Sequence, residues 1–330
     1  MTTRIEADYL IETAWPLEQA AEMLAGEQSS GTFVPVPGET PELKARAAAR
    51  VEAITPLDFV ATPSLPGAGR ADQPHQQARI TVSWPMANLG PSLPNLMATV
   101  AGNAFELNAF SGLRLLDLRL PPSFVAANPG PAFGVAGTRR LSGVHGRPLV
   151  GTIVKPSVGF TADQTADLVR VLCAAGIDFI KDDELQADGP SCPFDGRARA
   201  VMAVINDHAQ RTGKKVMYAF NVTGEVDEMR ARHDLVEALG GTCVMASLNS
   251  VGVTGLLALR RHARLPIHAH RNGWGYLSAP GAGMGLCRLV QDMASGRGRS
   301  SARERHPQQI LRKRRQFRCQ RPVPGRSSVG

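Results

Sequence analysis

Apolar segments alternate with amphipathic segments between residues 149 and 270, and this alternation predicts the fold of the second half of the chain. Five continuous apolar segments predict strands at residues 149–155, 178–182, 215–222, 243–248 and 265–270. Apolar positions at helical spacing predict helices at residues 161–175, 197–210, 225–239 and 255–262. Continuous apolar strands that alternate with amphipathic helices are typical of a parallel sheet covered by helices. Five such units favour a (β/α) barrel over an open sheet, although periodicity alone leaves both architectures open.

The first 125 residues alternate short strand and helix patterns in a different order, which predicts a small α+β domain. Strands are predicted at residues 4–13, 78–84 and 113–120, helices at 17–24 and 95–108, and a helix-like or mixed segment at 45–54. The Pro- and Gly-rich segment 121–134 predicts a loop-rich connection between domains. We therefore expect an α+β domain over residues 1–130, a partial barrel over 131–285 and a separate tail over 286–330.

The tail differs from the rest of the chain in composition. Residues 297–330 contain ten Arg, one Lys and one acidic residue, so the remainder carries a net charge of −2 although the whole chain carries +8. Few apolar residues and a high charge predict a disordered tail. A complete barrel has eight units in roughly 250 residues, whereas this sequence contains five recognisable strands, so the predicted barrel is incomplete.

Composition narrows the class of protein. Hydrophobic content of 43% and charged content of 20% are typical of a globular protein. No apolar run approaches the ~18 residues of a membrane helix, and the N-terminus lacks a signal-peptide core, which predicts a cytoplasmic protein without a membrane partner. Five widely spaced cysteines favour reduced thiols. We do not expect nucleic-acid binding, because the basic tail has no interleaved aromatic residues apart from Phe317.

The motif K-D-D-E (181–184) lies at the carboxyl end of the predicted strand at residues 178–182 and is the strongest chemical signal in the sequence. Barrels place their catalytic groups at the carboxyl ends of their strands. Asp183 and Glu184 supply the oxygen ligands that Mg²⁺ prefers. Lys181 supplies an anionic oxygen only if its neutral amine reacts with CO₂ to form a carbamate, which requires a lowered pKa. A solvated cluster of charges at a strand end is the equally weighted alternative.

Other polar residues follow neighbouring strands. Lys155 ends the first strand, Asn221 and Thr223 end the third, and His268, His270 and Arg271 end the fifth. Lys155 and His270 are candidate acid and base groups, and Arg271 suits a substrate phosphate or carboxylate. Each has an alternative: Lys155 at a simple strand end before Pro156, and Arg271 in a surface ion pair. We expect a structural role for His268, which lies deeper in the strand.

Six motifs together resemble the large subunit of RuBisCO, and more closely the RuBisCO-like proteins. They are E-Q-S-S-G-T-F (27–33), A-G-N-A-F (101–105), D-L-R-L-P (117–121), G-R-P-L-V-G-T-I-V-K-P (146–156), D-F-I-K-D-D-E (178–184) and H-A-H-R (268–271). The resemblance implies an N-terminal ferredoxin-like α+β domain followed by a (β/α)₈ TIM barrel, and a homodimer with a shared active site.

The resemblance also implies roles for particular residues. Lys181 would be the carbamylated lysine, and Asp183 and Glu184 the other Mg²⁺ ligands. Lys155 would be an acid/base lysine. The residues implied to bind substrate are His270 and Arg271 and, from the partner chain, Glu27, Thr32 and Asn103.

Departures from the family pattern favour a RuBisCO-like protein over a carboxylase. Ser157 stands where carboxylases have a second lysine in K-P-K, and the segment around Trp274 is unlike theirs. We predict Mg²⁺-dependent enolisation, isomerisation or decarboxylation of a phosphorylated keto-sugar or sugar acid. The alternatives are an inactive truncated remnant and a ribulose-bisphosphate carboxylase. The abrupt change in composition after about residue 285 predicts a frameshifted or truncated family member.

Overall fold

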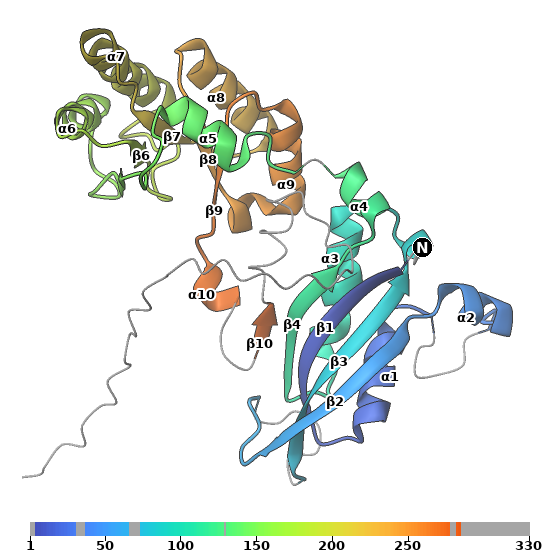
Figure 1. Ribbon diagram of the computed structural model, residues 1–330. Coiled ribbons are helices and arrows are strands. Elements are labelled where there is room, and N and C mark those ends of the chain that lie inside the picture. Colours follow the sequence, from blue (N-terminus) through green and yellow to red (C-terminus); the bar gives the residue numbers. More distant parts are fainter. Residues whose placement is uncertain (1–3, 31–36, 66–72, 129, 278–281, 285–330) are drawn as a thin grey trace, which may run out of the picture. The chain divides into compact units, whose positions relative to one another are not determined.

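The computed structural model describes residues 4–30, 37–65, 73–128, 130–277 and 282–284. Its first part is an α+β domain with four long strands: β1 (Arg4–Thr13), β2 (Arg50–Val60), β3 (His75–Pro85) and β4 (Gly112–Arg119). The sheet order is β10-β4-β1-β3-β2, in which β1 to β4 pair antiparallel and the short β10 (Ala282–Met284) runs parallel to β4. The helices of this domain are α1 (Leu17–Glu27), α2 (Pro41–Ala47), α3 (Leu93–Ala101) and α4 (Pro122–Ala127), with 3₁₀ turns η1 (Met86–Asn88) and η2 (Asn103–Glu106). The succession β1-α1-β2-β3-α3-β4 confirms the ferredoxin-like prediction (Figure 1).

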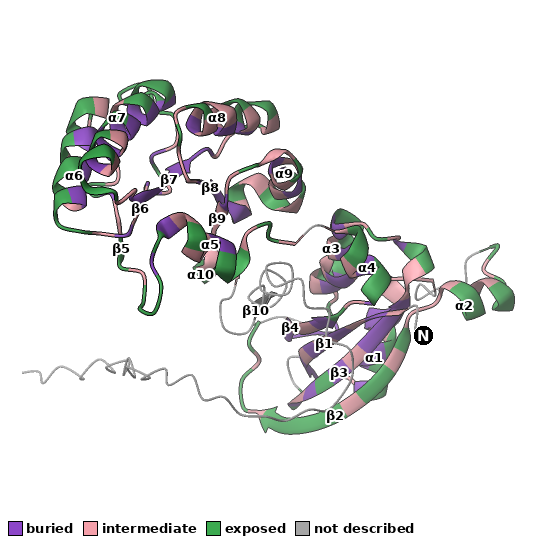
Figure 2. Ribbon diagram, turned by 45° about the horizontal axis from the view of Figure 1, so that its top comes forward, coloured by how far each residue is buried: buried purple, intermediate pink, exposed green. Residues whose placement is uncertain are grey.

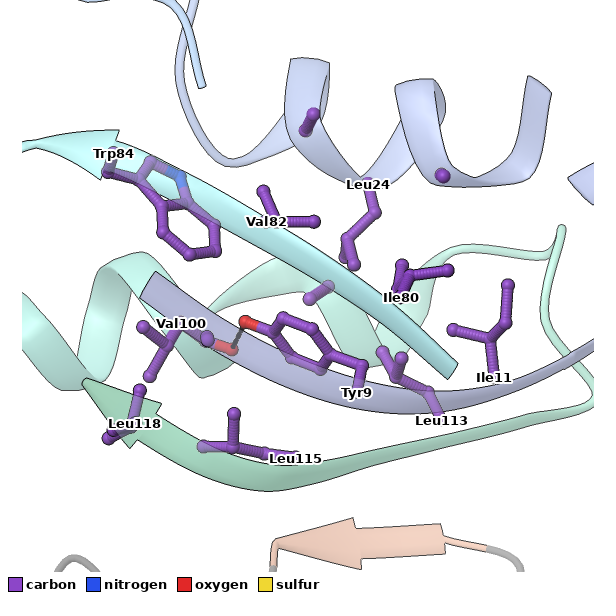
Figure 3. Packing of buried hydrophobic residues seen from close by; sticks show 14 of the residues in the cluster. Tyr9, Ile11, Leu24, Ile80, Val82, Trp84, Val100, Leu113, Leu115 and Leu118 are labelled. Atoms are coloured by element: carbon purple, nitrogen blue, oxygen red, sulfur yellow. Dashed lines mark hydrogen bonds between the residues drawn. The ribbon is translucent and has the colours of Figure 1, made fainter. Parts of the chain in front are cut away.

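Strict alternation in β1 gives this domain its core. Ile5, Ala7, Tyr9 and Ile11 are fully buried, while the residues between them are partly exposed. Helices α1 and α3 cover the buried face of the sheet, and Figure 3 shows their side chains meeting those of the strands. The buried Tyr9 hydroxyl donates to the Val100 carbonyl oxygen at 2.7 Å, so the one polar atom of this ring is satisfied (Figure 3).

The segment 45–54, predicted to be helix-like or mixed, is mixed: it contains the end of α2 and the start of β2, because Val51 and Ile54 pair with β3. Another prediction in the first domain was wrong in detail. The segment 121–134, expected to be a loop, contains α4 and the first residue of α5 (Gly134–Ser142). Proline is favoured in the first turn of a helix, and Pro122 begins α4.

The second part contains five parallel strands in chain order, which confirms the prediction of five β/α units. The strands are β5 (Gly151–Ile153), β6 (Phe179–Lys181), β7 (Met217–Asn221), β8 (Cys243–Ser247) and β9 (Ile267–His270). The helices are α6 (Ala162–Ala174), α7 (Phe194–Thr212), α8 (Val226–Ala238), α9 (Leu248–His262) and the short α10 (Trp274–Leu277). Every residue of β7 and β8 is buried, as expected for parallel strands covered on both faces.

The two faces of this parallel sheet have different neighbours. Tyr218 and Phe220 of β7 pack against the helices, whereas Met217 and Ala219 face a smaller apolar cluster with Met245 of β8. Figure 2 shows buried residues along the strands and exposed residues on the outer surfaces of α6, α7 and α8. The inner cluster therefore lies on the side that a closed barrel would enclose.

Several predictions fall outside the described residues. The basic tail at 286–330, the compositional change after residue 285 and Thr32 all lie there. Among the helices that the structure describes, none is long and apolar enough to cross a membrane.

Asp178 joins the amino-terminal ends of three neighbouring strands. Its buried carboxylate accepts two hydrogen bonds from Arg147 (2.6 and 2.9 Å), one from Lys214 Nζ (2.8 Å) and one from the Val150 N–H (2.9 Å). The Arg147 guanidinium, followed by Lys214 and the Val150 N–H, holds the pKa of this carboxyl well below its usual range despite burial. The charged form of Asp178 is therefore stabilised by folding.

Asp178→Asn should lower the free energy of unfolding by about 1–3 kcal/mol, because three donors lose a charged acceptor while Arg147 and Lys214 remain partly hydrated. Urea denaturation at pH 7 measures this loss. The contribution of Asp178 is complete above the pKa of an unfolded aspartate, about 4, and declines as the pH falls below it toward the folded value. The difference between the two proteins should therefore shrink in acid.

Asp167→Asn is the matched control, since Asp167 forms an exposed ion pair with Arg170 on α6. We expect a change below about 0.5 kcal/mol for this surface pair. Equal effects of the two substitutions would contradict the role assigned to Asp178.

Candidate active site at the carboxyl ends of the parallel strands

Because β5 to β9 are parallel neighbours, their carboxyl ends lie at one edge of the sheet. Lys181 is the last residue of β6, Asn221 of β7 and His270 of β9, and Lys155 follows β5 by two residues. The strand register thus brings to one edge most of the polar residues that the sequence analysis selected in this domain. Asp183 and Glu184 follow Lys181 in the turn after β6.

Lys155 and Asp183 form the shortest ion pair at this edge. Lys155 Nζ donates to Asp183 Oδ2 at 2.5 Å and to Ser157 Oγ at 2.8 Å. The Asp183 side chain is 1% exposed and that of Lys155 is 57% exposed. Burial acts to raise the pKa of the Asp183 carboxyl, but the Lys155 ammonium and the Leu185 N–H stabilise its charged form, and the net effect is a lowered pKa. Asp183 is thus a buried carboxylate whose oxygen contacts a cation.

Lys181 extends over the inner apolar cluster. Its Nζ donates to the Asp182 carbonyl oxygen at 3.0 Å and lies 4.0 Å from Met245 Sδ. Loss of hydration lowers the pKa of the Lys181 amine, and the nearby Lys155 adds to this effect, while Glu184, Asp183 and Asp182 oppose it. The neutral amine is consequently accessible at a lower pH than for a free lysine.

His270 contacts the second acid of the K-D-D-E motif. Its Nε2 lies 3.3 Å from Glu184 Oε2, and its ring stacks on that of His268 with centroids 6.1 Å apart. Burial, followed by the charge of Lys181, lowers the pKa of His270 and lowers that of the more buried His268 to about 4. Both imidazoles are therefore neutral at pH 7. His268 also packs against the Phe179 ring at 5.7 Å, in keeping with the structural role expected for it.

Arg271 follows β9 and is exposed. Its guanidinium lies over the Trp274 ring, 5.2 Å from the ring centre. This cation–π contact holds the side chain without using its hydrogen-bond donors, so the guanidinium keeps its capacity to bind an anion.

The candidate residues of the first domain lie in adjacent segments. Glu27 is the last residue of α1, and the exposed Asn103 begins η2. Gln28 connects the two segments through its side-chain amide. In the orientation that satisfies both amide atoms, the nitrogen donates to the Ala98 and Thr99 carbonyl oxygens, and the oxygen accepts from the Ala104 N–H. The segments that carry Glu27 and Asn103 are thus linked within the domain, and the binding role of these two residues stays a prediction.

A second cluster has the residue types of a metal site, but hydrogen bonds occupy both ring nitrogens of one of its histidines. Ligand atoms of His233, Asp234 and His262 lie within 4.8 Å of one another. However, His233 Nε2 accepts from the backbone N–H groups of Arg264 (3.1 Å) and Leu265 (3.3 Å), so the proton is on Nδ1 and is donated to Asp234 Oδ1 at 3.0 Å. His233 therefore has no free lone pair for a metal, and the cluster fixes the turn before β9.

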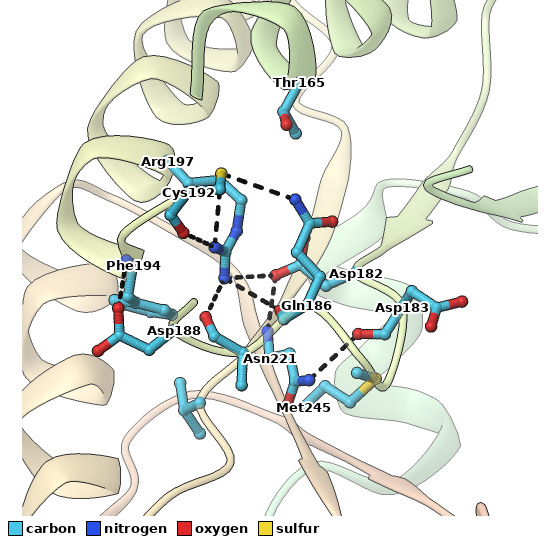
Figure 4. Close-up of polar contacts among 12 residues, drawn as sticks. Thr165, Asp182, Asp183, Gln186, Asp188, Cys192, Phe194, Arg197, Asn221 and Met245 are labelled. Carbon is cyan, nitrogen blue, oxygen red and sulfur yellow. Dashed lines mark hydrogen bonds and ion pairs between the residues drawn. The ribbon is translucent and has the colours of Figure 1, made fainter. Parts of the chain in front are cut away.

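The sequence analysis did not select the buried polar network behind the acids. Asp182, Arg197 and Tyr218 are almost fully buried, and Arg197 and Tyr218 both hydrogen-bond to Asp182. Figure 4 shows Arg197 and Asp182 in this network. One signal was present: Arg197 lies at helical spacing with the buried Val201 and Ile205, where a charged residue requires a buried partner.

The chain combines an antiparallel α+β domain with parallel β/α units whose strand ends carry charged residues. This is a two-domain α/β protein with its candidate active site at the carboxyl ends of the parallel strands. Residues 7–124 match the family model of the N-terminal domain of the ribulose bisphosphate carboxylase large chain, and residues 134–294 match that of its catalytic domain. The chain belongs to the RuBisCO large-chain family, and its relatives include RuBisCO-like proteins, as the sequence motifs predicted.

Two curated relatives are 60% and 46% identical to this chain over the aligned residues. A 3-oxo-isoapionate-4-phosphate transcarboxylase/hydrolase of Xanthobacter autotrophicus is 60% identical over 277 residues, 84% of this chain and 67% of the relative. A 3-oxo-isoapionate-4-phosphate decarboxylase of Rhizobium etli is 46% identical over 282 residues, 85% of this chain and 67% of the relative. The chain thus spans about two thirds of the length of these relatives.

Solved structures of the family share the fold. A rubisco-like protein from Burkholderia fungorum superimposes with a TM-score of 0.82 at 46% identity, covering 88% of this chain and 70% of the other. A dimeric archaeal Rubisco from Hyperthermus butylicus superimposes with a TM-score of 0.78 at 27% identity, covering 89% of this chain and 66% of the other.

Lys155→Met should raise the pKa of Asp183 in the metal-free protein, because the buried carboxylate loses its ammonium partner while its burial remains. Carboxyl ¹³C shifts followed by NMR as a function of pH measure the change. Lys44→Met, which removes the ion pair of the exposed Lys44 with the partly buried Glu39 in the first domain, is the control and should leave Asp183 unchanged. An identical Asp183 titration in the two variants would show that Lys155 does not contact this carboxylate in solution.

Proposed function

We propose that this chain carries out Mg²⁺-dependent enolisation chemistry, in the form of decarboxylation of a phosphorylated 3-oxo sugar acid, and not carboxylation of ribulose bisphosphate. The observation that carries the proposal is the convergence of two carboxylates and three basic side chains at one edge of the parallel sheet. Asp183 pairs with Lys155, Glu184 contacts His270, and Lys181 lies near both acids.

The donor set at this edge fits a hard divalent cation. Asp183 and Glu184 provide carboxylate oxygens, each of which now contacts a basic group. The buried Asp183 keeps its charge because a cation is already beside it. Asp183, Glu184 and a modified Lys181 would therefore hold Mg²⁺. When bound, the ion supplies Lewis-acid stabilisation of negative charge on substrate oxygens.

Lys181 is suited to carbamate formation. Its neutral amine would attack CO₂, forming an N–C bond and releasing one proton to yield an anionic carbamate with two oxygens. The lowered pKa of Lys181 increases the fraction of neutral amine near pH 7. The carbamate would add the oxygen ligand that an ammonium cannot provide.

The substrate class is taken from the relatives. Relatives at 60% and 46% identity are named for 3-oxo-isoapionate 4-phosphate. In decarboxylation of a 3-oxo acid, the bond to the carboxylate carbon breaks, CO₂ leaves, the electron pair passes to the 3-oxo oxygen and a proton is later added to carbon. His270, neutral at pH 7, and Lys155 are the proposed proton-transfer groups, and Arg271 would bind an anionic group of the substrate.

Ser157, the residue that follows Lys155 and Pro156, argues against carboxylation. Ser157 occupies the position of the second lysine of carboxylases, and its hydroxyl oxygen accepts a hydrogen bond from Lys155. A hydroxyl provides no positive charge for the additional carboxylate that carboxylation forms.

A homodimer is the proposed assembly. The structural relative from Hyperthermus butylicus is a dimeric Rubisco, and the adjacent Glu27 and Asn103 lie on the first domain, as the family's shared site requires. In this proposal Glu27, Thr32 and Asn103 of one chain bind the substrate held by the other.

Release of CO₂ from 3-oxo-isoapionate 4-phosphate by the full chain, in Mg²⁺ and bicarbonate, tests the function. Lys181→Met, Asp183→Asn and Glu184→Gln should each lower kcat/KM by at least about 100-fold, because each removes a ligand of the proposed cation. Binding of Mn²⁺, followed by electron paramagnetic resonance, provides a readout independent of turnover and should weaken in the same three variants.

Lys44→Met is the control and should retain both activity and metal affinity. Turnover that is unchanged by chelator or by Lys181→Met would refute the metal-dependent mechanism. Incorporation of labelled CO₂ into ribulose bisphosphate would favour the carboxylase alternative, and absence of both turnover and Mn²⁺ binding would favour the inactive remnant.

A further inference from the structure

Asn221 contacts the main chain of both proposed acidic ligands. Its Nδ2 donates to the Asp183 carbonyl oxygen at 3.1 Å and to the Glu184 carbonyl oxygen at 3.2 Å. Its Oδ1 accepts from the Thr223 hydroxyl at 2.6 Å and from the Thr223 N–H at 3.2 Å. The side chain is fully buried and all its donors and acceptors are used, so the amide has one favourable orientation.

Asp182 fixes the residue immediately before these ligands. Its carboxylate accepts from the Tyr218 hydroxyl at 2.5 Å and from the Asn221 N–H at 2.9 Å, and it pairs with Arg197 at 3.4 Å. Asn221 therefore forms two sets of hydrogen bonds with this turn. Its backbone N–H binds the Asp182 carboxylate, and its side-chain amide binds the carbonyl oxygens of Asp183 and Glu184. Figure 4 shows Asp182 and Asp183 directed to opposite sides of this turn.

Arg197 fixes the other end of the same turn. It donates to the carbonyl oxygens of Gln186 (3.2 Å), Ala187 (2.6 Å) and Cys192 (3.0 Å). The backbone on both sides of the acids is thus bound by side chains that do not themselves face the proposed cation. Such partners of metal ligands commonly change metal affinity ~10–100-fold when they are removed.

We propose that Asn221 is a positioning residue for the cation: it presents Asp183 and Glu184 by fixing their main-chain carbonyl groups, without being a ligand itself. The inference rests on the proposed function, because it assigns Asn221 to the same metal site. The amide is 38 residues away from Asp183 and 37 away from Glu184 in sequence, and β7 brings it to them because β6 and β7 pair in parallel.

The test is Mn²⁺ binding by the full chain in bicarbonate buffer, followed by electron paramagnetic resonance, with Asn221→Ala and Asn206→Ala as a matched pair. Asn206 is a partly buried asparagine on α7 whose Nδ2 donates to the Leu239 carbonyl oxygen at 3.1 Å, remote from the acids. Asn221→Ala should weaken Mn²⁺ binding ~10–100-fold relative to wild type. Asn206→Ala should change it less than about twofold, since surface and structural contacts outside a site leave its affinity intact.

Thermal unfolding separates positioning from general destabilisation. Both alanine variants should lower the melting temperature of the metal-free protein, whereas the rise in melting temperature on adding Mn²⁺ should be reduced only in Asn221→Ala. If the Mn²⁺ affinity of Asn221→Ala lay within twofold of that of Asn206→Ala, the inference would be overturned.

Thr223 provides a second variant that keeps Asn221 in place, in case Asn221→Ala does not fold. Thr223→Val removes the hydroxyl that orients the Asn221 amide. It should weaken Mn²⁺ binding about fivefold, which corresponds to the net free energy of one hydrogen bond. Thr223→Ser keeps the hydroxyl and should restore the affinity. Equal Mn²⁺ affinity in the two Thr223 variants would also overturn the inference.

Wild type and Asp183→Asn distinguish failure of the inference from failure of the proposed function. If wild type binds Mn²⁺ and Asp183→Asn does not, the metal site stands and the Asn221 and Thr223 variants alone decide the inference. If wild type and Asp183→Asn bind Mn²⁺ equally, the metal site itself is refuted.

Discussion

The buried carboxylate of Asp182 is the charge on which the geometry of the candidate site depends. An uncompensated carboxylate in this position would be costly, so Tyr218, Arg197 and the Asn221 N–H must all be present around it. Strand alternation then determines its neighbours: with Asp182 directed toward the helices, Lys181 faces the inner cluster beside Met245. A single buried charge thus fixes the direction of the side chain proposed to be carbamylated.

The acids at the site are arranged with basic groups already in contact with them. Lys155 neutralises Asp183, and His270 contacts Glu184. A divalent cation entering this site would compete with the Lys155 ammonium for the same carboxylate oxygen. Binding of the cation would therefore release Lys155 from Asp183 and leave its amine available for proton transfer, which links occupation of the metal site to the state of a proposed catalytic group.

Sequence periodicity predicted the parts of the fold that depend on local pattern. The five parallel strands and the ferredoxin-like order follow from alternation and from apolar runs. Convergence of Lys155, Lys181 and His270 could be predicted because parallel strands end at one edge. For the segment 45–54 the sequence left a helix-like or mixed structure open, since its division between α2 and β2 depends on the pairing of Val51 and Ile54 with β3. Asn221 was predicted at the same edge as the acids, but its hydrogen bonds to the main chain of Asp183 and Glu184 depend on side-chain orientations that periodicity does not specify.

The proposed site divides into two parts with different structural requirements. Among the described residues, the contacts that orient Asp183 and Glu184 come from Lys155 after β5, from β7 and from α7, and His270 is contributed from β9. In the proposed function, substrate binding draws in contrast on Arg271 and on Glu27, Thr32 and Asn103 of the partner chain. Under this proposal, cation binding requires only the correct packing of a contiguous set of β/α units. Catalysis would additionally require that Arg271 and the partner's residues meet the cation around one substrate, so the two proposed properties can be lost separately.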